Sequence, residues 1–378
     1  MKYSKKAAFI NRKKEISFLK KWIKEEPEYI LFFYGPKSSG KTTLINRFIQ
    51  EHLDKKEFDV KFLNLRKTFI SSYKDFIQAF FGVNISDKDR TQKEIREYNL
   101  KVFKLSYEAI NCLKQGELDP FSIMKKELEK IKRKGKQPLI IIDELQALQD
   151  VYINGQRELI KELFNFFVAM TKESHLCHFL ISSSDGYFIE RVYNDSKLTK
   201  TSELLEVDYL NKEDVFYWLS HLEKESDIEN FSLTDRQIEK IWYYFGGSVW
   251  EISAFLSKLL RNSENGGVAD YILEKEAARE ITAYKVRFND FYAGYHEHRV
   301  RLLERANACF EKSGKVVLKD MNPLIKKGLF SSDSLQKELG ILVRDNLFSF
   351  NPVTGEYKPQ GHSAALGLRE YCRNVPEF

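Results

Sequence analysis

The chain has 378 residues, with 61 Lys or Arg against 55 Asp or Glu, so its formal net charge is +6. A single hydrophobic core of this size would be unusually large, so the length predicts two or three domains. Aromatic residues make up 14% of the chain and Pro and Gly are few, which argues against disorder. No apolar run has the ~18 residues that span a bilayer.

The cysteines and the first residues of the chain favour a cytoplasmic protein. A disulfide framework or a zinc site has little support, because no CxxC or CxxH pair occurs among Cys112, Cys177, Cys309 and Cys372. Residues 1–6 lead into no apolar signal core. We therefore expect a soluble protein without membrane contact. The excess of positively charged residues is spread along the chain and is only a weak indication of nucleic-acid binding.

Residues 9–23 predict the first helix. The segment FINRKKEI places Asn11 where a helix N-cap is expected, and Ile16, Leu19 and Ile23 then recur on one face. This helix is expected to pack its apolar side against a core.

Residues 29–50, YILFFYGPKSSGKTTLINRFIQ, combine a short apolar run, a glycine-containing turn and a helical pattern. The turn matches GxxxxGK[ST], and strand, turn and helix are the context in which this motif binds phosphate. Backbone N–H groups and the helix N-terminus attract the phosphate chain, Lys41 reaches its β and γ phosphates, and Thr42 ligates Mg²⁺. The residues expected to bind ATP or ADP are Gly35, Pro36, Lys37, Ser38, Ser39, Gly40, Lys41, Thr42 and Thr43.

Two further apolar segments predict strands of the same sheet. Residues 58–65 read FDVKFLNL, and residues 138–146, PLIIIDELQ, are typical of a parallel strand buried on both faces. At the end of the second strand, Asp143 is expected to hold Mg²⁺ and Glu144 to orient and deprotonate the attacking water. The alternative is a strand that merely ends in two surface acids.

A helix over residues 156–171 and a strand within residues 175–185, HLCHFLISSSD, come next. The serines at the strand tip, with Ser183 as the catalytic candidate, are expected to sense the phosphate or position the water. Serines after a strand also simply satisfy turn backbone, which is the alternative. The alternation of strands and helices predicts an α/β fold with a parallel sheet flanked by helices.

These motifs and their order resemble the archaeal ATPase family of the STAND class, a branch close to the AAA+ ATPases. FINRKKEI is similar to the family's FxxRxxEL box, which implies that Asn11 and Arg12 bind near the base and phosphates. Residues 204–219 are similar to its last core strand and first lid helix. The resemblance extends over residues 7–280 and implies a P-loop NTPase core at 1–206, followed by a helical lid and linker at 207–298.

Two positions depart from the family's pattern. Residues 196–202, SKLTKTS, lack the arginine that the family has before the lid, which leaves Arg191, Lys197 and Lys200 as candidates for a charge-supplying finger. The family's GGxP turn, which touches nucleotide, is Gly246-Gly247-Ser248-Val249 here, and its two glycines also fit a plain helix C-cap.

Residues 299–378 predict helices followed by a hairpin in NLFSFNPVTGEYKPQG, the order of a winged helix, which the same family often carries at this end. The candidate recognition helix, SDSLQKELGILVRDN, is close to neutral, so DNA binding has weak support. An unknown protein partner or signal is the other reading, and the oligomeric state stays open.

Together these features predict a Mg²⁺-dependent ATPase that works as a nucleotide-controlled conformational switch, with water attacking the γ-phosphate. The alternative is an ATP-regulated DNA-binding factor resembling origin-recognition ATPases. A kinase is less expected, because no phosphoacceptor-binding motif is present. ATP is expected over GTP, because Asn211, in the sequence NKED, fits a helix cap better than a guanine-binding motif.

Overall fold

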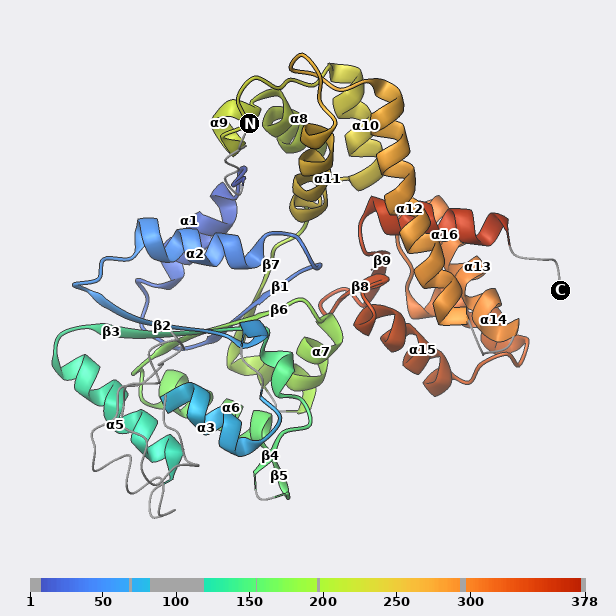
Figure 1. Ribbon diagram of the computed structural model, residues 1–378. Coiled ribbons are helices and arrows are strands. Elements are labelled where there is room, and N and C mark those ends of the chain that lie inside the picture. The colour runs from blue at the N-terminus through green and yellow to red at the C-terminus, as the bar shows by residue number, and fades with distance from the viewer. Residues whose placement is uncertain are drawn as a thin grey trace, which may run out of the picture.

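The computed structural model describes residues 8–67, 70–81, 119–153, 155–195, 198–292 and 297–374. Its centre is a five-stranded sheet in the order β2-β3-β6-β1-β7, with every neighbouring pair parallel (Figure 1). The predicted α/β class with a parallel sheet is therefore confirmed. The strands are β1 (Ile30–Tyr34), β2 (Phe58–Asn64), β3 (Gln137–Asp143), β6 (His178–Ser183) and β7 (Ser202–Glu206).

The three central strands, β3, β6 and β1, are buried on both faces because helices cover both faces of the sheet. Alternate residues of β1 point to opposite sides, so Leu31 and Phe33 pack into one core and Phe32 packs into the other. The first core lies under α1 (Lys13–Trp22) and α2 (Lys41–His52). The second lies against α3 (Tyr73–Phe81), α5 (Pro120–Arg133), α6 (Leu159–Val168) and α7 (Gly186–Asp195) (Figure 1).

The strand order brings residues that are distant in sequence to one edge of the sheet. Because β6 lies between β3 and β1, the carboxyl ends of all three strands are neighbours. In the register of the sheet, Asp143 stands opposite Asn64 on one side and Ser182 on the other, and Ser183 stands opposite Tyr34. The end of β1, where the phosphate loop begins, therefore lies beside the predicted acids.

The helix predicted over residues 156–171 begins later than expected. Residues 157 and 158 form the short strand β5 (Arg157–Glu158), which pairs antiparallel with β4 (Tyr152–Ile153). Only α6 is α-helical, and it ends in a π-helical turn at Ala169–Glu173. The hydrophobic pattern continues through all three elements, which is why the sequence alone merges them into one helix.

A helical lid follows β7. It has its own core around the buried Trp218, which Ala8 and Ile10 from the start of the chain also join. Asn211 caps its first helix as predicted, since its Oδ1 accepts the Asp214 N–H at 2.8 Å. Its helices are α8 (Lys212–Ser220), α9 (Leu222–Ser226), α10 (Asp235–Phe245), α11 (Val249–Arg261) and the first part of α12 (Asp270–Tyr292).

The C-terminal part has a core of its own, and its elements follow the predicted order. The predicted hairpin is confirmed, and Tyr357 on its second strand also pairs with Val316 through an isolated bridge. The elements are α13 (Glu297–Ser313), α14 (Asn322–Lys326), α15 (Ser332–Arg344), β8 (Phe348–Asn351), β9 (Glu356–Pro359) and α16 (His362–Arg373). The boundaries 1–206, 207–298 and 299–378 stay predictions.

The hairpin of the C-terminal part packs against the sheet domain. The ring of Tyr187, in α7, stacks on Phe350 with centroids 4.4 Å apart, and its hydroxyl bonds that of Tyr357. Asn351 also donates to Glu206 at 3.1 Å. The C-terminal part is thus held against the sheet domain by a ring stack and two hydrogen bonds. Within the part of the chain that the structure describes, no helix has the length and apolarity to span a membrane.

Candidate active site

The phosphate loop connects β1 to α2 and requires glycine at its first position. Gly35 has φ +150°, and a Cβ there would lie 2.2 Å from the carbonyl oxygen of Val207. The loop is therefore packed directly against the chain that follows β7. Its end is also left-handed, with Ser38 at φ 70° and Gly40 at φ 94°, and α2 starts at Lys41. The helix N-terminus thus faces the concave side of the loop, as an anion site requires.

Lys41 is buried inside this loop. Its Nζ donates to the carbonyls of Gly35 and Pro36, at 2.8 Å each. Burial lowers the pKa of Lys41 to about 8, against the opposing charges of Glu144 and Asp143. A phosphate oxygen at the loop would offer this amine a charged acceptor.

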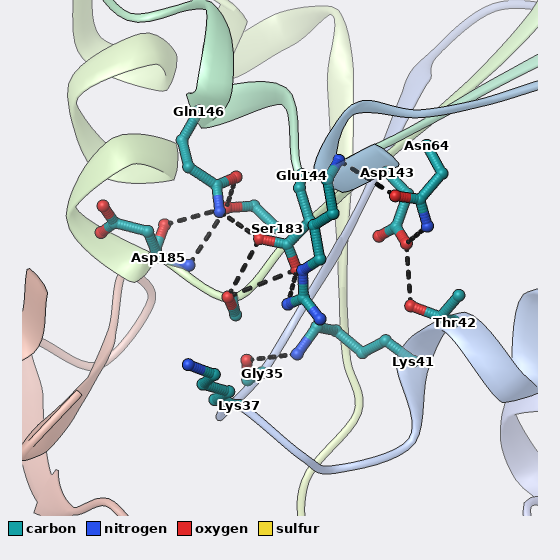
Figure 2. A network of polar contacts seen from close by, with 12 residues as sticks. Gly35, Lys37, Lys41, Thr42, Asn64, Asp143, Glu144, Gln146, Ser183 and Asp185 are labelled. Atoms are coloured by element: carbon teal, nitrogen blue, oxygen red, sulfur yellow. Dashed lines mark hydrogen bonds and ion pairs between the residues drawn. The ribbon is translucent and has the colours of Figure 1, made fainter. Parts of the chain in front are cut away.

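Asp143 and Thr42 form the part of the site that fits a metal ion. Thr42 Oγ1 donates to Asp143 Oδ2 at 2.8 Å, and Asn64 Nδ2 donates to the same oxygen at 3.1 Å (Figure 2). The other oxygen, Oδ1, is buried and has no hydrogen-bond partner among the residues that the structure describes. A hydroxyl and a carboxylate with a spare buried oxygen are the hard donors that Mg²⁺ prefers, so the residues fit this ion.

The rest of a metal's coordination would have to come from elsewhere. Among the residues described, no group of three or more His, Cys, Asp or Glu could hold a metal ion alone. Mg²⁺ is commonly bound by one or two protein groups together with substrate phosphates and water. The site therefore fits a metal that arrives with a nucleotide.

Glu144 follows directly in an unusual backbone conformation. Its φ is 65°, a region that side-chain-bearing residues seldom adopt and that is common at functional sites. Its buried carboxylate makes an ion pair with Arg66 and accepts from Gln146, and Ser184 Oγ lies 3.3 Å away (Figure 2). It is thus held at the cavity by three polar neighbours.

Of the three serines, Ser184 is the one beside the carboxylate. Ser183 donates instead to Gln146 Oε1 at 2.8 Å and accepts the Asp185 N–H at 3.1 Å, so it reaches Glu144 only through Gln146. Ser182 is buried, and its hydroxyl has no hydrogen-bond partner in the described part of the chain. A direct role for Ser183 in sensing phosphate stays a prediction.

The loop opens into a cavity of about 830 Å³, a volume usual for sites that bind small molecules. One wall belongs to the sheet domain and includes Lys41, Thr42 and Glu144. The opposite wall comes from the lid, α12 and the C-terminal part; it consists of Ser248, Val249, Trp250, Glu251, Ser253, Tyr284, Arg287, Asn346 and Gln360. All three parts of the chain therefore meet at the phosphate loop.

Asn11 and Arg12 lie behind the loop and do not line this cavity. The buried Arg12 donates to the carbonyls of Ser39 (2.7 Å) and Asp208 (2.8 Å), and so ties the loop to the start of the lid. Asn11 donates to both carboxylate oxygens of Asp214, at 3.0 and 2.9 Å. The expectation that Asn11 caps α1 is wrong: Arg12 is the N-cap residue, with φ 71° and no side-chain cap. Nucleotide contact by this pair stays a prediction.

The candidates for a charge-supplying finger lie away from the cavity or outside the described residues. Arg191 on α7 and Lys200 are exposed, and neither lines the cavity, while Lys197 is outside the described residues. In the turn at residues 246–249, Gly246 is the C-cap of α10, which is one of the two alternatives, while Ser248 and Val249 line the cavity.

Sequence reasoning missed Asn64, Arg66 and the residues of the second wall. Asn64 lies at the end of the predicted strand at residues 58–65 and Arg66 follows that strand, so polar residues at the tip of a parallel strand are the signal that could have found them. The second wall carries no local motif, because it depends on how distant segments pack.

A parallel sheet with a phosphate loop, a neighbouring Asp–Glu pair and a helical lid defines the class of AAA+-like P-loop ATPases. The chain belongs to the archaeal ATPase family: residues 9–255 match the model of an ATPase domain found predominantly in Archaea. The resemblance seen in the sequence is therefore confirmed at the level of the family.

Relatives and solved structures agree with this assignment. An uncharacterized ATP-binding protein of Methanocaldococcus jannaschii is 32% identical over 97% of this chain and 98% of its own length. Another, from Pyrococcus abyssi, is 29% identical over 96% of this chain and 98% of its own length. The ORC2 protein of Aeropyrum pernix, solved in ADPNP–ADP complexes, shares the fold, with a TM-score of 0.56 at 13% identity over 97% of this chain and 94% of that one.

Proposed function

We propose that this protein hydrolyses ATP with Mg²⁺ and acts as a nucleotide-controlled conformational switch of the STAND type. One observation carries the proposal: Lys41, Thr42 and Glu144 line a single cavity, and Thr42 is hydrogen-bonded to Asp143. Family membership supports ATP binding, and the glutamate after the aspartate supports turnover.

In the proposed reaction, water attacks the γ-phosphorus in line with the bond to the leaving oxygen, giving ADP and phosphate. Glu144 accepts the proton of the water, and its contacts with Gln146 and Ser184 orient the carboxylate. Lys41 and the N-terminus of α2 hold the β and γ phosphates. Asp143 and Thr42 would hold Mg²⁺, which when bound offsets the charge of the phosphates.

The switch is supported by contacts that three parts of the chain make beside the loop. The Tyr209 hydroxyl donates to the Lys37 carbonyl at 2.9 Å. With its amide oriented to satisfy both neighbours, Gln360 accepts the Lys37 N–H at 2.6 Å and donates to the Phe348 carbonyl at 3.2 Å. A movement of the loop on binding or losing the γ-phosphate would therefore reach the C-terminal part, which we propose is a winged helix.

Replacing Lys41 tests the binding half of this proposal. Lys41→Ala is expected to abolish ATP and ADP binding in a calorimetric titration, while Lys130→Ala retains binding, because Lys130 lies on α5, pairs with Glu127 and is outside the cavity. Small-angle scattering tests the switch: the radius of gyration should differ between the ADP complex and the complex with a non-hydrolysable ATP analogue. Wild-type binding by Lys41→Ala, or identical scattering of the two complexes, would contradict the proposal.

DNA binding under control of ATP is the second candidate, favoured by the fold shared with the ORC2 protein. Two observations weigh against it. The exposed charges of α15 and its end, Asp333, Lys337, Arg344 and Asp345, sum to zero, and the hairpin is packed against the sheet domain through Phe350. Filter binding of duplex DNA at rising salt concentration tests this second candidate. Absence of binding at about 50 mM salt would contradict DNA binding, and a steep fall of the affinity with salt would support it.

A further inference from the structure

A second cavity borders the phosphate loop. It has a volume of about 540 Å³, within the range of sites that bind small molecules, and its wall includes Gly35 and Pro36, the first residues of the loop. The rest of the wall comes from the end of β7, the start of the lid, α10, the hairpin, the end of α13 and the start of α16. Of the described residues, Tyr209 alone lines both cavities, so the second cavity is a compartment separate from that of Lys41.

The second cavity is acidic, although the chain as a whole carries a net positive charge. Among the described residues, its wall contains the carboxylates of Glu206, Asp208 and Glu356 and one ammonium group, that of Lys358. The wall therefore has a net charge of −2 when its histidine is neutral. Two of the carboxylates have a lysine nearby: Lys358 lies 3.8 Å from Asp208, and Lys315, which is outside the wall, pairs with Glu356.

Glu206 is the carboxylate of this wall that has no ion-pair partner among the residues described. It accepts a hydrogen bond from Asn351 at 3.1 Å, and Asn351 stands opposite Glu356 in the hairpin. Partial burial and the charge of the neighbouring Asp208 raise the pKa of Glu206. Its ionised form is thus less favourable here than in water, and a cation that entered the cavity would offset this cost.

Aromatic side chains make up much of the remaining wall. Trp242 and Phe245 come from α10, Phe310 from α13, Phe350 from β8 and Tyr34 from β1. The faces of such rings carry partial negative charge and attract cations, while their apolar surface packs against methylene groups. Rings beside carboxylates therefore suit an alkylammonium ion better than a hydrated metal ion.

We propose that this cavity binds a small organic dication, in which two ammonium groups are joined by a short chain of methylenes. Two positive charges match the net charge of the wall, and the methylenes match its rings. Each ammonium group donates up to three hydrogen bonds, for which Glu206, Asp208 and Glu356 offer charged acceptors.

Such a ligand would contact all three parts of the chain. The carboxylates come from the sheet domain (Glu206), from the connection to the lid (Asp208) and from the hairpin (Glu356). A molecule that binds only when these parts lie together stabilises the arrangement in which they do so. The cavity is thus a site for a small-molecule regulator, and its occupation does not depend on the proposed ATPase function.

The test is a calorimetric titration of the full chain with putrescine, 1,4-diaminobutane, without nucleotide. Two competitors separate the contributions: 1,4-butanediol has the same carbon chain without charge, and Mg²⁺ has the same charge without methylenes. We expect about one putrescine per chain, and we expect each competitor to displace it at least about tenfold more weakly than unlabelled putrescine displaces a labelled sample, because each lacks either the charge-assisted hydrogen bonds or the ring contacts.

Three variants locate the binding. Glu206→Gln keeps an acceptor for Asn351 but removes a charge, and should weaken putrescine binding about tenfold. Lys358→Met removes the cation of the wall and should tighten binding about threefold, the effect of one exposed charge at short range. Glu203→Gln is the matched control, because Glu203 is an exposed acid of the same strand and does not line the cavity.

Absence of putrescine binding at millimolar concentration would overturn the proposal, and so would equal displacement by the diol or by Mg²⁺. An unchanged affinity in Glu206→Gln, or the same loss in Glu203→Gln, would also overturn it, because the binding would then lie elsewhere. A thermal melt of each variant identifies a loss of folding. If Glu206→Gln does not fold, Lys358→Met decides, since its side chain is largely exposed, and binding that is unchanged or weaker in this variant would contradict the proposal.

Discussion

Lys41 yields a pH dependence that follows from its burial. Burial lowers the pKa of this amine from the ordinary 10.5 to about 8, and the negative charges of Glu144 and Asp143 oppose that effect. The difference favours the neutral amine by about 3 kcal/mol relative to an amine in water. Only the ammonium form attracts phosphate, so nucleotide affinity should depend on its protonation.

The magnitude follows from the fraction of Lys41 that is charged. With the pKa at about 8 in the free protein, ATP affinity should be about tenfold weaker at pH 9 than at pH 7, approaching a tenfold loss per pH unit beyond. The effect on folding has the opposite sign. Because the unfolded chain holds this proton more tightly, the contribution of Lys41 to stability rises between pH 8 and 10.5.

The assay is a titration with an ATP analogue from pH 7 to 9.5 at constant free Mg²⁺. The tyrosines of the cavity stay neutral over this range, because burial raises the pKa of Tyr284 to about 12 and that of Tyr209 well above its usual 10. Lys41→Arg keeps a permanent charge and should flatten the profile, however weakly it binds. A wild-type affinity that stays constant to pH 9.5, or the same fall in Lys41→Arg, would refute the reasoning.

Four other variants test separate parts of the structure. Asp143→Asn should strongly raise the Mg²⁺ concentration that gives half-maximal ATPase activity. Asn64→Ala should raise it about tenfold, as expected for loss of a residue that orients a metal-binding carboxylate. An unchanged Mg²⁺ dependence in both variants would contradict the metal assignment. Gly35→Ala places a Cβ 2.2 Å from a backbone carbonyl at positive φ, which should cost about 2–5 kcal/mol in a denaturation experiment; wild-type stability would show that the loop is not packed as described. Gly186→Ala places a Cβ 2.0 Å from a carbonyl of β8 and should loosen the hairpin from the sheet domain, seen as faster proteolysis of the C-terminal part; an unchanged digestion rate would argue against this interface.

The sheet domain could be predicted from sequence because its signals are local. The loop motif, the apolar run before Asp143 and the glutamate after it are each contained in a few neighbouring residues. The order of the strands is not local, and it is what places Asn64 beside Asp143. A polar residue at the end of a strand becomes a site residue only when the neighbouring strand is known.

Strand register and tertiary packing account for the other differences between the site predicted from the sequence and the site in the structure. The sequence offers three serines in a row, and only the path of the chain after β6 decides that Ser184 faces Glu144 while Ser183 faces Gln146. Asparagine is a residue type that often caps a helix N-terminus, yet the left-handed backbone of Asn11 directs its amide to Asp214 in the lid. The cavity wall opposite the phosphate loop carries no sequence motif, and its place depends on how the lid, α12 and the C-terminal part pack.

Glu144→Gln tests the central claim most directly, in a single-turnover experiment with ATP prebound to excess protein and Mg²⁺ added to start the reaction. We expect this variant to bind ATP within about 3-fold of the wild type and to convert it to ADP at least about 100-fold more slowly, because the amide cannot accept the proton of the water. Conversion at the wild-type rate would show that Glu144 is not the base and that the assignment of this site is wrong.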